Sequence, residues 1–168
     1  MIREICLYNN VKCVYNDKNE VYQAVFYLKN WTEVRLALQC DPENPASVFA
    51  MKFIADTFFE DLDHWTQYAQ EFIIKRFLPY FYRVAGKGSE TVLDKKRLKS
   101  MLILSRITIN SEGKLTMAFK PFSIGKRTSV LWAYGNMKEG FTELCDQTEI
   151  IPKVDREDYP ETDSEFGE

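Results

Sequence analysis

The stretch FFEDLDHWTQYAQEF, residues 58–72, holds the only histidine of the 168-residue chain, with carboxylates close to it. Asp61 and Asp63 precede His64, so a metal site or a general acid–base centre is the first chemistry to consider. In a helix, residues 61 and 64 share a face but residue 63 does not, and further metal ligands would have to come from elsewhere. Asp is also preferred at helix N-caps, where its charge suits the positive helix end. We therefore interpret this cluster as a corner at which a second helix starts, and predict no metal site.

This sequence offers few candidate residues for nucleophilic catalysis. A serine or cysteine nucleophile usually needs a neighbouring base, and His64 is the only histidine that could act as one. No G-x-S-x-G motif is present, and the AGKGSE stretch at 85–90 does not match the P-loop pattern. Dispersed carboxylates remain an open alternative, since the two acids of a glycosidase are not sequence neighbours. We predict that the chain is not an enzyme and uses no cofactor.

The cysteines and the hydropathy pattern bear on the compartment. Cys6, Cys13, Cys40 and Cys145 have spacings that fit no zinc motif. No apolar run is long enough to cross a membrane, and polar residues interrupt the N-terminus too early for a signal peptide. These features predict reduced, partly buried thiols in a cytoplasmic protein without a membrane partner.

Charge is distributed unevenly along the chain. Residues 75–127 contain 13 basic and 3 acidic side chains, whereas residues 1–74 contain 6 basic and 11 acidic ones. A solvated surface is one interpretation of such a basic stretch, and a surface that steers an acidic partner is the other. For the second interpretation, the candidate partner-binding residues are Lys95, Lys96, Arg97, Lys99, Arg106, Lys126 and Arg127.

Residues 152–168 form an acidic tail with 7 acidic and 2 basic side chains. We predict that this tail is loose and lies outside a single domain formed by residues 1–151. Asp155, Glu157 and Asp158 are further candidate partner-binding residues. The tail has three possible roles: a solubilising end, a segment that folds back on the basic stretch, or a mimic of a phosphate backbone for the basic cleft of a nuclease.

The elements that would position these groups follow from the spacing of apolar residues. Strands are predicted at 3–8, 12–16, 21–28 and 33–40, the last with alternating apolar and polar sides. On its polar side, the 33–40 strand carries Glu33, Arg35 and Gln39. Later strands are predicted at 100–109, 115–122 and 128–136, and residues 140–145 as an edge strand or a turn. Gly113 supplies the positive φ for the hairpin turn at 110–114.

Between the two groups of strands, Asn44 and Pro45 predict the start of a helix. Apolar side chains, including Phe49, Phe53 and Phe58, then recur every three to five residues up to Tyr80. This spacing predicts one long helix, or two helices bent near residues 59–63, with a wide apolar face that covers a sheet. A short helix is also possible at 92–100. The order of elements predicts an α+β domain with a mostly antiparallel sheet packed against one long or two consecutive aromatic-rich helices.

The C-terminal half also carries a resemblance to a known family. LILSRITINSEGKLTMAFKPFSIGKRTSVLWAYGNMKEGFTEL joins a hairpin to a G-N-x-x-x-G-F ending, and upstream FYLKNWTEVRLALQCDPENP precedes the aromatic helix. This layout resembles a bacterial group designated domain of unknown function 2262, over roughly residues 20–145. Members of that group tend to have His and Gly in the late strands where this chain has Trp132 and Tyr134. No catalytic residues are established for the group, so the resemblance assigns none here.

Small α+β proteins of this kind are similar to immunity proteins, the cytoplasmic inhibitors encoded beside bacterial toxins. The resemblance and the segregated charge together predict a non-enzymatic protein-binding module, an immunity or antitoxin-like inhibitor that binds its partner by charge complementarity. The alternative is a nucleic-acid-associated module that uses the basic segment 94–127. The overall acidity, with a pI of about 5.4, argues against that alternative.

Overall fold

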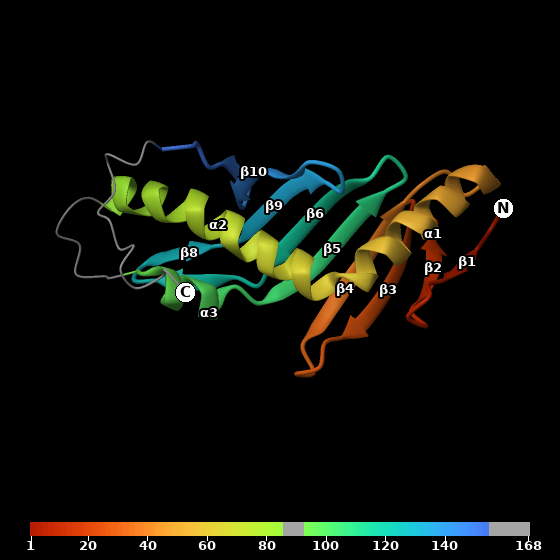
Figure 1. The fold of residues 1–168 in the computed structure, drawn as a ribbon, viewed down its shortest axis with the longest axis horizontal. Coiled ribbons are helices and arrows are strands. Elements are labelled where there is room, and N and C mark those ends of the chain that lie inside the picture. The colour runs from red at the N-terminus through yellow and green to blue at the C-terminus, as the bar shows by residue number, and fades with distance from the viewer. Residues whose placement is uncertain (86–92, 155–168) are drawn as a thin grey trace.

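The computed structural model describes residues 1–85 and 93–154, which form a long sheet with helices on one of its faces (Figure 1). The strands before the helices are β1 Glu4–Cys6, β2 Lys12–Asn16, β3 Val21–Tyr27 and β4 Glu33–Gln39. The helices are α1 Pro45–Glu60, α2 Leu62–Ala85 and α3 Lys95–Met101. The later strands are β5 Leu104–Asn110, β6 Lys114–Phe119, β7 Phe122–Ile124, β8 Arg127–Ser129, β9 Leu131–Asn136, β10 Gly140–Asp146 and β11 Glu149–Ile150.

The main sheet has nine strands in the order β1-β2-β3-β4-β5-β6-β9-β10-β11, and β7 pairs with β8 in a separate hairpin. Every neighbouring pair is antiparallel except β4 and β5, which are parallel. A parallel pair needs a long crossover connection, and the segment between β4 and β5 contains α1, α2 and α3. The predicted α+β class with a mostly antiparallel sheet is therefore confirmed.

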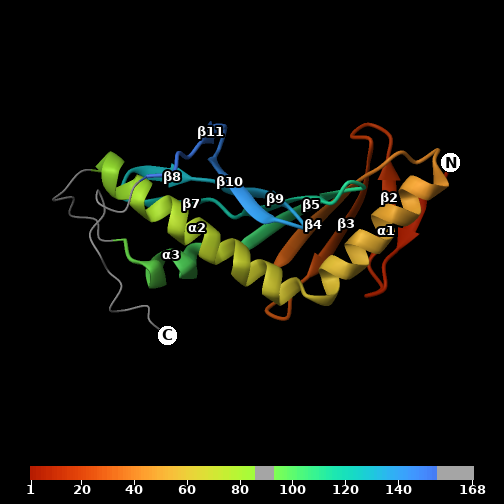
Figure 2. The same ribbon diagram turned by 45° about the horizontal axis from the view of Figure 1, so that its top comes forward.

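The long helical stretch is divided in two at Asp61, as one of the two predicted alternatives states (Figure 2). The N–H of Asp61 donates to the carbonyl of Phe58, and its own carbonyl accepts from the N–H of Trp65 in the first turn of α2. At the other end of α1, the Asn44 side chain accepts from the N–H groups of Ala46 and Ser47, as expected of an N-cap. Pro45 follows at the first helical position, where its missing N–H has no intrahelical partner to lose.

The core lies between the helices and one face of the sheet. Val48, Met51, Ala55 and Phe58 are the buried residues of α1. At the junction of the two helices, the rings of Phe58 and Trp65 stack with centroids 5.9 Å apart. The ring of Phe141 in β10 meets Trp65 edge-on at 6.1 Å. This aromatic cluster joins α1, α2 and the C-terminal part of the sheet.

Some sequence-based expectations are corrected. Phe49 and Phe53 were expected on the apolar face of the helix, but both are exposed on the opposite side of α1. At about 100° per residue they lie roughly half a turn from Met51, Ala55 and Phe58, so the counted recurrence mixed two faces. The β7–β8 hairpin, with Gly125 at φ 59°, interrupts the region where two longer strands were predicted. The 92–100 helix begins instead at Lys95, after its N-cap Asp94.

Candidate binding face of the sheet

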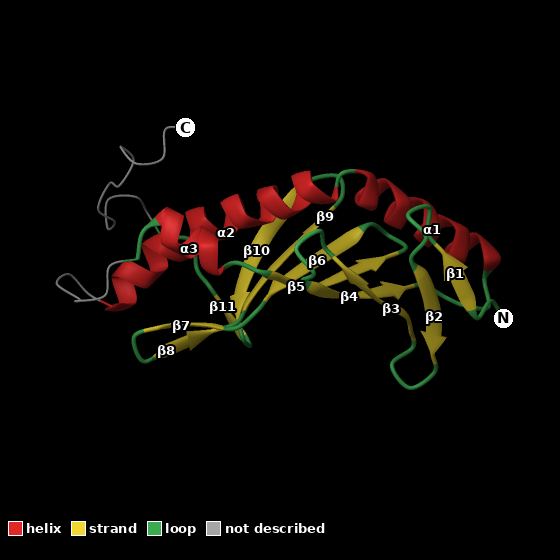
Figure 3. Ribbon diagram, turned by 90° about the horizontal axis from the view of Figure 1, so that it is seen from below, coloured by secondary structure: helices red, strands yellow, loops and turns green. Residues whose placement is uncertain are grey.

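One face of the main sheet has no helix against it among the described residues (Figure 3). The strand sequences explain this, because in β4 the buried Val34, Leu36 and Leu38 alternate with residues that point the other way. The outward side chains of six neighbouring strands therefore collect on what we call the uncovered face. They are Gln23, Val25, Tyr27, Glu33, Arg35, Ala37, Gln39, Arg106, Thr108, Asn110, Lys114, Thr116, Ala118, Trp132, Tyr134, Asn136, Glu143 and Cys145.

Two arginines lie side by side at the centre of the uncovered face. The parallel register of β4 and β5 sets Arg35 opposite Arg106, on strands about 4.8 Å apart. Nε of Arg35 is 3.7 Å from a carboxylate oxygen of Glu33, and both side chains are exposed. Arg106 is exposed and makes no hydrogen bond or ion pair with any residue of 1–85 or 93–154. Two adjacent cations with one exposed carboxylate nearby favour the binding of an additional anion.

Aromatic side chains lie two strands away from the arginines. Ala118 of β6 pairs with Arg106 on one side and with Trp132 of β9 on the other. Tyr134 follows in the next row of the same face, opposite Thr116. Trp132 is half-buried and Tyr134 is exposed at its edge, so both present apolar surface with a polar tip. Ala118 is the small residue in this row, and it leaves a depression between the guanidinium and the indole.

Three shallow hollows adjoin one another along the uncovered face. The largest, of about 620 Å³, is lined by Gln23, Ala37 and both arginines among others. A hollow of about 510 Å³ is lined by the same two arginines together with Ala118 and Trp132. A third, of about 340 Å³, lies over Thr108, Thr116 and Tyr134. Arg35 and Arg106 thus separate two hollows, and a bound segment can contact both.

At its far end, on β9 and β10, the uncovered face carries the neutral side chains of Tyr134 and Cys145 and the acidic side chain of Glu143. Burial raises the pKa of Tyr134 above its ordinary value, and nearby Cys145 and Glu143 add to the shift. Burial also raises the pKa of the Cys145 thiol, helped by Glu143, which accepts a hydrogen bond from its Sγ at 3.8 Å. Both groups therefore keep their protons near neutral pH. Cys145 acts as a hydrogen-bond donor here, and its raised pKa disfavours the thiolate form.

The other end of the face is apolar. Val25 pairs with Arg35 and Tyr27 with Glu33, and both β3 residues are exposed. In the turn that joins β3 to β4, Trp31 is 83% exposed and has a left-handed backbone with φ 62°. The N–H of Trp31 donates to the carbonyl of Leu28, and the N–H of Leu28 donates to the carbonyl of Thr32, so the turn is closed. Exposed aromatic residues at such a position are typical anchors of protein interfaces.

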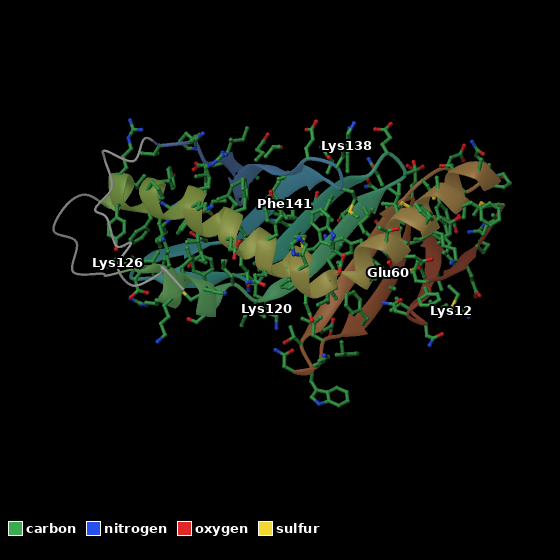
Figure 4. All side chains as sticks on the ribbon, in the orientation of Figure 1. Lys12, Glu60, Lys120, Lys126, Lys138 and Phe141 are labelled. Atoms are coloured by element: carbon green, nitrogen blue, oxygen red, sulfur yellow. The ribbon has the colours of Figure 1, made fainter. Side chains whose placement is uncertain are left out.

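The structure does not bring the predicted basic residues together. Lys95, Lys96, Arg97 and Lys99 belong to α3, which packs beside α2 on the helical side of the molecule. Arg106 lies on the opposite side of the sheet, next to Ile107 of the core. Lys126 stands in the β7–β8 turn at one end of the molecule, far from Lys120 near its middle (Figure 4). A single patch made of all these side chains is therefore excluded.

Arg127 has a structural role. Its guanidinium donates to a carboxylate oxygen of Asp146 at 2.9 Å and lies over the ring of Tyr80 at 5.3 Å. The same carboxylate accepts from the hydroxyl of Ser129 and from the backbone N–H of Val130. Burial lowers the pKa of Arg127, but its hydrogen bonds to Tyr80 and Asp146 outweigh burial, so the pKa is raised overall. Of the remaining predicted partner-binding residues, Asp155, Glu157 and Asp158 lie outside the described residues.

The histidine cluster is the predicted corner between two helices. His64 is exposed in the first turn of α2, and its ring stacks on Tyr68 with centroids 6.2 Å apart. Asp63 lies in the same turn, where a carboxylate suits the helix dipole. In residues 1–85 and 93–154, no group of three or more His, Cys, Asp or Glu side chains is placed to hold a metal ion.

Comparison of the chain with protein-family models, with curated proteins and with solved structures finds no match in any of the three. None of the described helices is both long and apolar enough to span a membrane. Sequence reasoning selected Arg106 but missed Arg35, Trp132 and Tyr134 as candidate binding residues. Arg35 was already on the polar side of the predicted 33–40 strand, but the sequence did not show that this strand pairs with the strand that carries Arg106.

Proposed function

We propose that this chain is a non-catalytic binding protein that receives a partner protein on its uncovered face, in the manner of a bacterial immunity or antitoxin-like inhibitor in the cytoplasm. One observation carries the proposal: a broad sheet face that no helix of residues 1–85 or 93–154 covers presents an arginine pair between aromatic side chains. Protein interfaces are enriched in arginine and in aromatic residues of this kind.

The dimensions of the face suit a protein partner. Six strands at a spacing of about 4.8 Å are about 24 Å across, and six residues along a strand extend about 20 Å. This area of about 480 Å² is about 60% of the roughly 800 Å² that each partner buries in a standard interface, and the exposed turn between β3 and β4 adds to it. Side chains of a partner can occupy the hollows along the face.

A nucleic-acid-associated function is the second candidate, and it now rests on other residues. The segment 94–127 is divided between two sides of the molecule, but arginines and aromatics on one sheet face also resemble a stacking platform for single strands. A salt titration separates the two functions. Phosphate contacts give an affinity that falls steeply with salt, whereas a protein interface with an apolar centre depends on salt less.

Capture experiments with paired variants test the proposal. The tagged chain is incubated with its native cytoplasm at low salt, with and without nuclease, and compared with an R35E/R106E variant. The control, K96E/K99E, makes the same charge change on exposed residues of α3. We expect one stoichiometric protein that survives nuclease and the control substitutions but is lost with R35E/R106E. Loss with the α3 variant alone, or recovery of nuclease-sensitive material only, overturns the proposal.

A further inference from the structure

We infer that the centre of the uncovered face is a subsite for a carboxylate side chain of an acidic, extended peptide segment, with an apolar side chain two residues along it in the hollow beside Trp132. This inference rests on the proposed function and specifies the chemistry of the partner. It combines two features that are adjacent in one row of the sheet: an arginine pair and a depression lined by an indole.

The arginine pair forms the anionic half of the subsite. Guanidinium groups bind carboxylates in bidentate geometry, and the parallel register presents two of them from neighbouring strands. Glu33 neutralises part of the charge of Arg35 at 3.7 Å, but Arg106 has no partner in the described part of the chain. The repulsion between the two arginines is relieved when a carboxylate lies between them.

The depression at Ala118 forms the apolar half. Ala118 is only 3% exposed, because the larger side chains of its row rise on both sides of it. The hollow above it has a volume of about 510 Å³ and is also lined by Trp132, Val130 and Pro121. That size falls within the range of about 300–1,000 Å³ found for ligand sites. An apolar side chain in this hollow would contact the indole, while an acidic side chain two residues away, on the same side of the extended peptide, reaches the arginines.

The surrounding polar groups favour a peptide over a nucleic acid. Gln23, Gln39, Thr108 and Thr116 can each donate and accept hydrogen bonds, which matches the alternating N–H and C=O groups of an extended peptide. A phosphate backbone only accepts hydrogen bonds. Running along the face, it would also pass Glu33, in the row on one side of the arginines, and Glu143 on β10, in the row on the other side. A single carboxylate at the centre avoids both acids.

Peptide titrations followed by NMR test the inference directly. The probe is an acetylated, amidated peptide of the repeat Glu-Ser-Leu-Ser, which places Glu and Leu on the same side of an extended chain, with a Gln-Ser-Leu-Ser peptide and oligothymidylate as comparisons. The indole N–H of Trp132 is the reporter, and it is distinguished from those of Trp31 and Trp65 by a W132F variant. We expect saturable shifts at Trp132 and at the Arg106 side chain with the Glu peptide, and an affinity at least about tenfold weaker for the Gln peptide. Equal binding of the two peptides, tighter binding of oligothymidylate, or no shift at Trp132 overturns the inference.

Variants assign the two halves of the subsite. R106Q removes one guanidinium, and we expect it to weaken binding of the Glu peptide about tenfold or more. A118L leaves the charge unchanged and fills the hollow, and we expect a comparable loss. K99Q on α3 is the matched control, because Lys99 is exposed on the helical side and should leave the affinity unchanged. Unchanged affinity in both R106Q and A118L contradicts the assignment.

The two proposals fail separately. If the captured protein is lost with R35E/R106E but the Glu peptide leaves Trp132 unperturbed, the binding function stands and the carboxylate chemistry is wrong. If the peptide binds as expected but the captured protein survives R35E/R106E, the subsite stands and the partner docks elsewhere.

Discussion

Asp146 is a charged residue almost removed from water, with 7% of its surface exposed. It accepts hydrogen bonds from Arg127, Ser129 and the N–H of Val130, so its carboxylate joins the β7–β8 hairpin to β10. Burying a charge is costly unless its hydrogen bonds are complete, and here three donors surround it. The network therefore holds one end of the sheet together, and it explains why Arg127 is not a free binding residue.

Replacing Asp146 with alanine should destabilise the protein by about 3 kcal/mol, because Arg127 and Ser129 lose their shared acceptor. The measurement is the free energy of unfolding from urea titrations. D17A is a matched control, since Asp17 pairs with Arg3 at 2.7 Å but both side chains are exposed. That variant should change the stability by no more than about 1 kcal/mol. Equal losses in D146A and D17A would show that the buried network carries no special stability.

At the scale of elements, the G-N-x-x-x-G-F motif is a hairpin docked on a helix. The Asn136 side chain accepts from the N–H groups of Lys138 and Glu139 and so closes the turn between β9 and β10. Gly140 has a left-handed backbone with φ 81°, and a Cβ there would lie 2.6 Å from Oη of Tyr68 on α2. The glycine thus serves both the turn and the close approach of α2.

Substitution of Gly140 by alanine separates these two roles when it is compared with Gly113. Both glycines have positive φ, at 81° and 84°, but the nearest atom to a Cβ at Gly113 is 4.0 Å away. We expect G113A to cost about 1 kcal/mol from backbone strain, and G140A about 2–4 kcal/mol because Tyr68 must also move. The double variant G140A/Y68A should recover part of the unfolding free energy that G140A loses. Equal unfolding free energies for the two alanine variants would mean that contact with Tyr68 is unimportant.

The helix α1 shows where a periodic pattern misleads. Asn44, Pro45 and the bend at Asp61 are local features, so their roles follow from the sequence. The orientation of the helix does not, because Phe49 and Phe53 are as hydrophobic as Phe58 and differ only in what lies against them. Pairing of β4 with β5 is harder still to foresee, since it joins residues 35 and 106 across the entire helical segment. Arg106 was therefore predicted as a binding residue without Arg35, which lies opposite it on β4.

The two faces of α1 should respond very differently to truncation. Phe58 is fully buried among aromatic rings, so F58A should cost about 3–5 kcal/mol in the free energy of unfolding. Phe53 is 73% exposed, and F53A should change the stability by less than about 0.5 kcal/mol. Thermal and urea unfolding of both variants provide the measurement. A large loss in F53A would mean that the outer side of α1 is covered in solution.

For the whole molecule, the asymmetry between its two sides matters more than its net charge. Basic side chains of the stretch 75–127 lie on both sides of the molecule, on α2 and α3 on the helical side and at Arg106 and Lys114 on the uncovered face. The uncovered face balances its cations with Glu33 and Glu143, so it is a surface of mixed and patterned charge. Such patterns select partners by complementarity, whereas a uniform positive field attracts any polyanion.

The pH dependence of stability is also a property of the whole fold, because several buried Cys and Tyr side chains hold their protons to a higher pH in the folded state than in the unfolded chain. Burial raises the pKa of Cys13 from 9.0 to about 12, with Cys6 and Asp56 adding to the effect. Burial likewise raises the pKa of Tyr22 from 10.0 to about 12 and that of Cys40 from 9.0 to about 11. In the unfolded chain these groups release their protons at the lower values. The contribution of these groups to the stability of the folded state is therefore fully present below about pH 9 and is lost as the pH rises toward about 12.

We expect the unfolding free energy in urea, under reducing conditions, to fall steadily above about pH 9. Y22F should be less stable near neutral pH, because the Tyr22 hydroxyl donates to the carbonyl of Ile2 at 2.6 Å. Its stability should nevertheless fall less steeply with pH, since one titrating group is gone. Y27F is the control for removing a tyrosine hydroxyl, because Tyr27 is exposed and its substitution should leave the stability near neutral pH unchanged. A wild-type stability that stays constant up to about pH 11, or an equal slope in Y22F, would show that these buried groups do not link protonation to folding.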